Sequence, residues 1–136
     1  MKVFALRLKP DQDLRQSLKE FALSNNIQAG FILSAIGSLK QAAIRFADQP
    51  KSEILQGRFE ILSLNGTLSV SGLHLHITIA GAVGNTIGGH LDNDSIIYTT
   101  AEIVIGASED LIFLRSPDPQ TGFLELDIQQ AKQRDE

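Results

Sequence analysis

The sequence predicts an α/β (α+β) domain, in which one N-terminal helix covers part of a curved, mainly antiparallel β-sheet. Apolar residues recur with helical spacing in only one segment, near the N-terminus. Most of the remaining chain consists of short apolar runs, and glycine, proline, asparagine or aspartate separates these runs. Many short strands joined by tight turns, together with one helix, account for both patterns.

The N-terminal segment predicts one strand followed by one helix. Residues 3–8 alternate between apolar and other side chains, which is typical of a strand, and Pro10 ends the run. Asp11 or Asp13 can cap the following helix, and the polar residues 24–26 end it. The apolar face of this helix has the spacing i, i+4, i+7, i+8 and consists of Leu14, Leu18, Phe21 and Ala22.

Nearly all of the chain after this helix predicts strands. Two sites favour tight turns, Asn65-Gly66 and the Ser71-Gly72 region, although Asn65-Gly66 fits a bulge inside one long strand equally well. We expect residues 1–130 to form a single domain and residues 131–136 to form a polar tail. The predicted strands cover residues 31–36, 42–46, 59–64, 68–70, 73–80, 96–105, 111–114 and 123–128.

Composition predicts a soluble, cytoplasmic protein. Apolar residues make up 43% of the chain and charged residues 21%, which are ordinary values for a globular domain. The chain has no cysteine, which removes disulfides and thiolate ligands and fits a reducing compartment. No apolar run approaches the roughly 18 residues of a membrane span, and the N-terminal apolar stretch is too short for a signal peptide.

The net charge of −4 is unevenly distributed along the chain. Residues 1–58 hold nine Lys and Arg against five Asp and Glu, whereas residues 59–136 hold three against eleven. No Lys or Arg lies between Arg58 and Arg115. Because cations that neutralise phosphates supply most of the affinity for a nucleic-acid backbone, direct DNA binding is not expected.

The clearest pointer to a chemical site is the clustering of His74, His76 and His90. They are the only histidines in the chain and lie in one glycine-rich stretch. In a strand, His74 and His76 share a face and lie about 7 Å apart, which is twice the rise per residue. Both imidazoles could then reach one ion at the roughly 2.0–2.1 Å Zn–N distance.

The turn before His90 decides whether this residue joins the pair. A two-residue turn at Gly84-Asn85 would pair Ile79 with His90 and place His90 on the apolar face. A loop one residue longer, or a bulge at Gly88-Gly89, would pair Thr78 with His90 on the correct face. His90 could also meet the pair from another subunit. Ordinary polar or hydrogen-bonded histidines are the alternative interpretation of the cluster.

Three histidine ligands would leave a fourth position for water or a small molecule, which is the arrangement of catalytic rather than structural zinc. Such a site can lower the pKa of a bound water toward about 7 and thereby supply a nucleophile. Glu60 or Glu102 could then accept a proton, although the sequence places neither near the histidines. No Ser-His-Asp spacing, phosphate-binding loop or dinucleotide fingerprint is present.

Two arginines each have two interpretations. Arg58 and Glu60 share one strand face, which indicates either a cross-strand ionic network or a surface for a partner. Arg115 begins the turn-rich residues 115–122. Its guanidinium could pair with a nearby aspartate or neutralise the carboxylate of a ligand.

Several motifs, in order along almost the whole chain, resemble the plants and prokaryotes conserved (PPC) domain family. The matching segments are residues 7–10, 35–39, 57–67, 74–77, 88–91, 100–103 and 118–123. The resemblance implies a PPC-domain-like fold that assembles as a homotrimer. It also implies a metal site of the prokaryotic type at the histidines, and no established reaction.

The resemblance also implies a surface for protein partners. In plant members the domain follows an AT-hook that binds the DNA minor groove, and the domain itself mediates oligomerisation and contacts with transcription factors. This chain has no Arg-Gly-Arg-Pro AT-hook. The segment that resembles the partner-binding portion consists of Gly57, Arg58, Phe59, Glu60, Ile61 and Leu62.

The sequence therefore predicts a small cytoplasmic homotrimer that acts as a binding or regulatory module. His74, His76 and His90 would hold zinc or another divalent metal, and a small molecule or a protein would be a further partner. The alternatives are a metal-dependent hydrolytic enzyme that uses the open metal position and a DNA-associated regulator.

Overall fold

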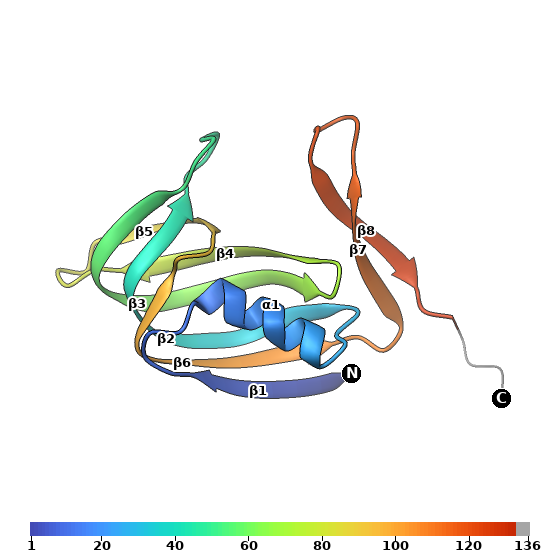
Figure 1. Cartoon of the computed structure of the whole chain (residues 1–136), viewed down its shortest axis with the longest axis horizontal. Coiled ribbons are helices and arrows are strands. Elements are labelled where there is room, and N and C mark those ends of the chain that lie inside the picture. Colours follow the sequence, from blue (N-terminus) through green and yellow to red (C-terminus); the bar gives the residue numbers. More distant parts are fainter. Residues whose placement is uncertain (133–136) are drawn as a thin grey trace.

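The computed structural model describes residues 1–132, which form one helix and eight strands (Figure 1). In chain order these elements are β1 (Lys2–Leu8), α1 (Leu14–Ser24), β2 (Gly30–Arg45), β3 (Glu53–Ser69), β4 (Gly72–Ala80), β5 (Thr86–Leu91), β6 (Ile96–Ala107), β7 (Leu111–Pro117) and β8 (Leu124–Gln130). Residues 133–136 of the predicted tail lie outside the described residues.

Six strands form one antiparallel sheet in the order β1-β6-β2-β3-β4-β5. The last strand, β5, also pairs with β2 through Ile44 opposite Leu91 and Arg45 opposite His90. Because β2 therefore pairs with β6, β3 and β5, strands β2 to β5 close into a ring at one end of the sheet. This confirms the prediction of a curved antiparallel sheet and brings the His90 end of the histidine stretch against β2.

The helix α1 lies across one face of the sheet (Figure 1). Asp13 caps it, since its side chain accepts a hydrogen bond from the backbone N–H of Gln16, so Asp13 rather than Asp11 fills this role. The side chains of Leu14, Leu18 and Ala22 are fully buried against the strands. The predicted apolar face of the helix is thus the face that joins the core.

Two pairs of predicted strands are in fact single long strands. Residues 31–36 and 42–46 belong to β2 and continue through Gly37, where an added Cβ would lie 2.2 Å from the carbonyl oxygen of Thr100. Residues 59–64 and 68–70 largely belong to β3, and Asn65-Gly66 is neither a turn nor a bulge, because the pairing with β4 is regular there. The register shift in β3 lies instead between Ile61 and Ser63. The turn predicted at Ser71-Gly72 is present between β3 and β4.

The C-terminal hairpin departs from the prediction of one sheet. Strands β7 and β8 pair only with each other and form a separate two-stranded sheet that stands away from the six-stranded one (Figure 1). Hydrogen bonds from the backbone N–H groups at the base of the hairpin go to the connections beside the sheet rather than to a neighbouring strand. Phe113 N–H donates to the carbonyl of Gln28, and Arg115 N–H donates to the hydroxyl of Ser71. The hairpin is thereby anchored beside the turn that precedes β4.

Within residues 1–132, the structure contains no helix with the length and hydropathy that crossing a membrane requires.

Candidate metal centre and the arginine-lined cavity

Strand β4 presents two histidines on its outer face. Its buried residues are Leu73, Leu75, Ile77 and Ile79, and His74 and His76 alternate with them on the exposed side. Alternation of this kind follows from the period of two in a strand, with leucine and isoleucine directed into the core. The prediction that His74 and His76 share the face opposite the leucines is confirmed.

Strand β5 brings His90 directly opposite His76. Both turn lengths considered from the sequence were too short, because Ala80 pairs with Thr86 and residues 81–85 form the connection. No bulge at Gly88-Gly89 is needed, since Thr78 pairs with Gly88 and Ile77 with Gly89 in regular register. The longer loop shifts the pairing by two residues relative to the three-residue loop, and a shift of two keeps a side chain on the same face.

The three imidazoles therefore converge within one chain. Their ring centroids lie 5.1 Å apart for His74 and His76, 5.4 Å for His74 and His90, and 6.0 Å for His76 and His90. One nitrogen atom from each ring can be chosen so that all three lie within 4.8 Å of one another. Tetrahedral Zn–N bonds of about 2.0–2.1 Å require roughly 3.4 Å between ligand nitrogens, so small rotations of the side chains suffice.

The surroundings favour the neutral form of two of these rings. The pKa of His74 lies below the ordinary value of 6.5; partial burial is the largest cause, and the charge of Arg115 is the next largest. Partial burial also lowers the pKa of His90, although Asp92 opposes this shift. His90 Nε2 lies 3.4 Å from Asp92 Oδ1. A neutral imidazole is the form that donates a lone pair to a metal, and a carboxylate beside it can orient the ring.

A cavity of about 530 Å³ opens beside His74 and His90. Its remaining lining comes from α1, β2, the β3–β4 turn and the β7–β8 hairpin: Arg15, Arg45, Ser71, Gly72, Leu73, Arg115, Phe123, Leu124 and Glu125. Three arginines and one glutamate therefore share this cavity with two of the histidines. The volume lies within the range of small-molecule sites.

Arg115 does not pair with a local aspartate. Its Nη2 donates a 2.8 Å hydrogen bond to Thr67 Oγ1, and Thr67 is the cross-strand partner of His74. No carboxylate lies within 4.0 Å of the Arg115 guanidinium in the described part of the chain. The interpretation that Arg115 pairs with a nearby aspartate is therefore wrong, and Glu125 is the carboxylate that acts on it from farther away.

The carboxylates considered as proton acceptors are not among the residues that line this cavity. Glu60 faces a different pocket together with Arg58, and Glu102 faces a third on the β1–β6 side. Glu125, which the sequence did not single out, is the glutamate of the histidine cavity. It comes from β8, which reaches this cavity only because the hairpin is anchored there, so the sequence carries no signal for it.

The segment of residues 57–62 lies in β3. Its side chains alternate, with Arg58, Glu60 and Leu62 exposed and Ile61 buried. The cross-strand ionic network predicted for Arg58 is not found among residues 1–132, because Arg58 stacks over the ring of Tyr98 at 4.2 Å instead. This segment is separate from the histidine cavity.

The family model of the Plants and Prokaryotes Conserved domain matches residues 1–109. The chain belongs to this family. The match covers β1 to β6 with all three histidines, and it ends before the β7–β8 hairpin. The hairpin residues of the cavity, Arg115 and Glu125 among them, lie beyond the matched part of this PPC domain.

Relatives of this PPC domain occur within larger proteins. Two proteins named bifunctional protein GlmU, from two Synechococcus strains, are 54% and 52% identical to it over 129 and 131 residues. These alignments cover 95% and 96% of this chain but only 20% and 21% of the relatives. The chain thus spans about a fifth of the length of these relatives.

Solved structures confirm the fold. A hypothetical protein from Salmonella enterica has a TM-score of 0.92 and 39% identity, with 95% of this chain and 94% of that chain covered. A metal-containing protein from Archaeoglobus fulgidus has a TM-score of 0.78 and 32% identity, with 93% of each chain covered. A plant- and prokaryote-conserved protein from Pyrococcus horikoshii, 20% identical, has a TM-score of 0.74 and covers 91% of this chain and 90% of its own.

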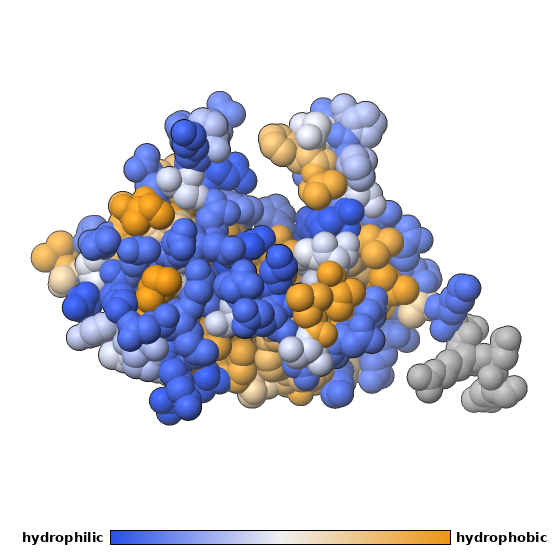
Figure 2. Space-filling view, in the orientation of Figure 1, coloured by the Kyte–Doolittle hydropathy of each residue, from blue (hydrophilic) through white to orange (hydrophobic). Residues whose placement is uncertain are grey.

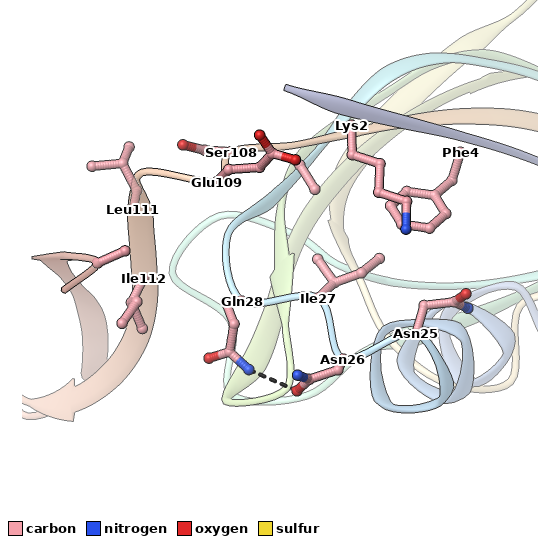
Figure 3. Close-up of a pocket in the computed structure, with 12 residues that line it drawn as sticks. Lys2, Phe4, Asn25, Asn26, Ile27, Gln28, Ser108, Glu109, Leu111 and Ile112 are labelled. Atoms are coloured by element: carbon pink, nitrogen blue, oxygen red, sulfur yellow. Dashed lines mark hydrogen bonds between the residues drawn. The ribbon is translucent and has the colours of Figure 1, made fainter. Parts of the chain in front are cut away.

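A second cavity of this PPC domain, of about 450 Å³, lies at the other end of the hairpin base (Figure 3). Figure 3 shows Lys2 and Phe4 on one side, and Leu111 on the other. Asn26 and Gln28 are joined by a 2.8 Å hydrogen bond between their side chains at its base. The Lys2 ammonium lies 5.0 Å from the Phe4 ring centroid. This cavity has no histidine in its lining, whereas His74, His90 and three arginines line the first cavity.

Proposed function

We propose that this PPC domain is a cytoplasmic, homotrimeric binding or regulatory module with a site for zinc or a similar divalent ion at His74, His76 and His90. The convergence of one nitrogen from each ring to within 4.8 Å carries this proposal. A zinc ion held by these residues would supply Lewis acidity and leave a coordination position for a small ligand.

Three further observations support a metal at this site. The lowered pKa values of His74 and His90 favour the neutral imidazoles, which reduces the competition between protons and a metal. Asp92 lies beside His90, where a carboxylate can accept a hydrogen bond from a histidine ligand and orient its ring. The Archaeoglobus relative, 32% identical, is itself described as metal-containing.

Exposed apolar side chains support assembly into an oligomer. Large hydrophobic residues are exposed on the β7–β8 hairpin and on strands β1 to β3, and Figure 2 shows part of this apolar surface over the hairpin. These exposed side chains are Val3, Leu33, Ile36, Ile54, Leu62, Leu114, Phe123, Leu124, Leu126 and Ile128. Contact between subunits would remove such surface from water, at about 25 cal/mol per Å² before the cost of association.

Metal analysis of the untagged protein tests the proposal. We expect zinc to co-purify, or to bind on titration, at one ion per chain. His76→Ala should remove this binding, because only two ligands remain. Asn65→Ala is a matched control, since Asn65 is the exposed cross-strand neighbour of His76 and offers no imidazole. A parent protein that binds no divalent metal would overturn the metal site.

A panel of hydrolase substrates and a duplex-binding assay at low salt separate the alternatives. Bound metal without turnover, and no salt-dependent DNA binding, is the result expected of a binding module. Turnover that disappears in His76→Ala would instead identify a metal-dependent hydrolytic enzyme. Steeply salt-dependent duplex binding would identify a DNA-associated regulator.

A further inference from the structure

Three arginines gather beside the histidines from three different elements. Arg15 lies on α1, Arg45 at the end of β2 and Arg115 on β7, and all three line the 530 Å³ cavity. They are separated by 30 and 70 positions in the sequence, so the fold alone brings them together. Glu125 is the one acidic residue of the lining, which leaves an excess of two positive charges.

The strand pairing places two of these arginines next to the histidines. Arg45 is the cross-strand partner of His90 in the β2–β5 pair, and directly opposite residues project from the same face of a sheet. Arg115 reaches the same region from the hairpin, where it bonds Thr67, the partner of His74. The two guanidinium groups thus flank the histidine cluster on two sides.

None of these arginines forms an ion pair within 4.0 Å in residues 1–132, although Glu125 acts on Arg115 from farther away. The ion pairs found there join the N-terminal amine to Glu109, Lys40 to Asp11, and His90 to Asp92. Arg15 donates to Asn93 and Arg115 to Thr67, both neutral acceptors. Half-buried guanidinium groups with neutral partners retain donors for an incoming anion.

The geometry of Arg115 indicates a preformed site. Its backbone N–H bonds the Ser71 hydroxyl, and its side chain lies over Gly72, where an added Cβ would be 3.1 Å from the Arg115 Cγ. A side chain held in this way loses little further freedom on binding, which favours affinity. The cavity also has an apolar part, formed by Leu73, Phe123 and Leu124.

We propose that this cavity binds a small organic anion, whose carboxylate or phosphate group is held by Arg45 and Arg115 beside the histidines and whose apolar part lies against Leu73, Phe123 and Leu124. Guanidinium groups bind carboxylates and phosphates alike through paired N–H donors. The site therefore selects the negatively charged oxygen pair that both groups have. This anion site rests on the proposed function, because it would give the proposed binding module its class of ligand.

Calorimetric titration of the full, untagged chain with benzoate, phenyl phosphate and benzamide tests this inference. Benzamide has nearly the shape of benzoate but no charge. We expect benzoate or phenyl phosphate to bind at least about tenfold more tightly than benzamide, because a charge-assisted hydrogen bond contributes about 1.5–3 kcal/mol. The tighter of the two anions identifies the natural head group. Equal binding of benzoate and benzamide, or no anion binding, would overturn the inference.

Variants assign the binding to the two arginines. Arg45→Gln and Arg115→Gln should each weaken anion binding about tenfold or more, whereas Arg7→Gln should not, because Arg7 is exposed on β1 and is not part of this lining. Arg115→Lys keeps the positive charge at the base of the hairpin but removes the paired N–H donors of the guanidinium. It therefore separates the loss of these donors from the loss of the hairpin. A thermal melt establishes that each variant is folded. Unchanged affinity in both glutamine variants would contradict the assignment.

Titrations with and without zinc distinguish this inference from the proposed metal site. His76→Ala removes a metal ligand but leaves both arginines in place, so it should lose zinc and still prefer benzoate to benzamide. Zinc binding without anion binding would overturn the anion site alone. Anion binding in a protein that takes no zinc would overturn the metal site and leave the arginine pocket standing.

Discussion

Two kinds of residue meet at the site: histidines whose neutral form is favoured, and arginines that form no ion pair within residues 1–132. His74 and His90 lose part of their hydration, which disfavours the charged imidazolium, and nearby arginines act in the same direction. Arg115 is itself partly buried, and its pKa is lowered from the ordinary value by this burial, with Glu125 opposing the shift. The site therefore favours ligands that carry lone pairs or negative charge over protons.

The lowered pKa values predict how the stability of the metal-free protein depends on pH. In the unfolded chain both histidines have the ordinary pKa of about 6.5, so the unfolded state takes up protons first as the pH falls. The contribution of the two histidines to the free energy of unfolding should be complete above about pH 6.5. It should decline as the pH is lowered through the folded-state pKa values of His74 and His90. Urea midpoints of chelator-treated protein between pH 8 and pH 5 measure this.

The control for this pH experiment is a double variant, His74→Gln and His90→Gln. Without the two titrating rings, the urea midpoint should change less between pH 7.5 and pH 5.5 than it does in the parent protein. A parent midpoint that stays constant or rises as the pH falls through 6.5 would contradict the assignment of lowered pKa values.

At the scale of elements, the site depends on the close approach of β3 and β4. Gly66 has a φ of +138° and is paired with Leu75, between the two histidines of β4. An added Cβ at Gly66 would lie 1.9 Å from the carbonyl oxygen of His74. A glycine is therefore required where the backbone of β3 passes the residue that carries the first imidazole.

Gly66→Ala is accordingly expected to destabilise the protein strongly. The left-handed backbone region and the clash with a carbonyl oxygen each cost about 1–3 kcal/mol, so the free energy of unfolding should fall by about 2–6 kcal/mol. Gly84→Ala is the control: it has a φ of +83° but open space around it, and should cost about 1–2 kcal/mol. Urea denaturation of both variants measures the difference. Equal losses would show that β3 and β4 can separate at little cost.

The elements themselves were predicted to different degrees. The helix was correct because its apolar spacing and the Asp13 cap are local signals. The boundaries of β2 and β3 were wrong because glycine and asparagine, which end many strands, here lie inside long ones. Gly37 and Gly66 permit close contact with a neighbouring strand, and a contact between distant segments leaves no periodic pattern.

At the scale of the whole molecule, the exposed apolar side chains argue for association. Leu62 belongs to the segment of residues 57–62 and is 54% exposed on β3. Together with Ile36 and Ile54 it places three large apolar side chains in exposed positions on β2 and β3. Such surface is uncommon on a monomer and is typical of subunit interfaces.

Leu62→Glu is expected to dissociate the proposed trimer, because it would place a charge in the proposed subunit interface. The parent protein should sediment at about three times the chain mass of 14.8 kDa at all concentrations, and the variant at the chain mass. Leu23→Glu is the matched control, since Leu23 is 53% exposed but lies on α1. A monomeric parent would refute the homotrimer, and a trimeric Leu62→Glu would move the interface away from residues 57–62.

The sequence by itself determined the class of fold, the helix and the shared face of His74 and His76. These features depend on periodicities of 3.6 and 2, which act between near neighbours in the chain. Only the tertiary structure decided that His90 lies opposite His76 and that Arg15, Arg45 and Arg115 surround the cluster. The length of the loop at residues 81–85, the closure of β5 on β2 and the anchoring of the hairpin fix those positions. The last two are contacts between distant segments, which leave no periodic pattern in the sequence, so the cationic cavity could not be predicted from it.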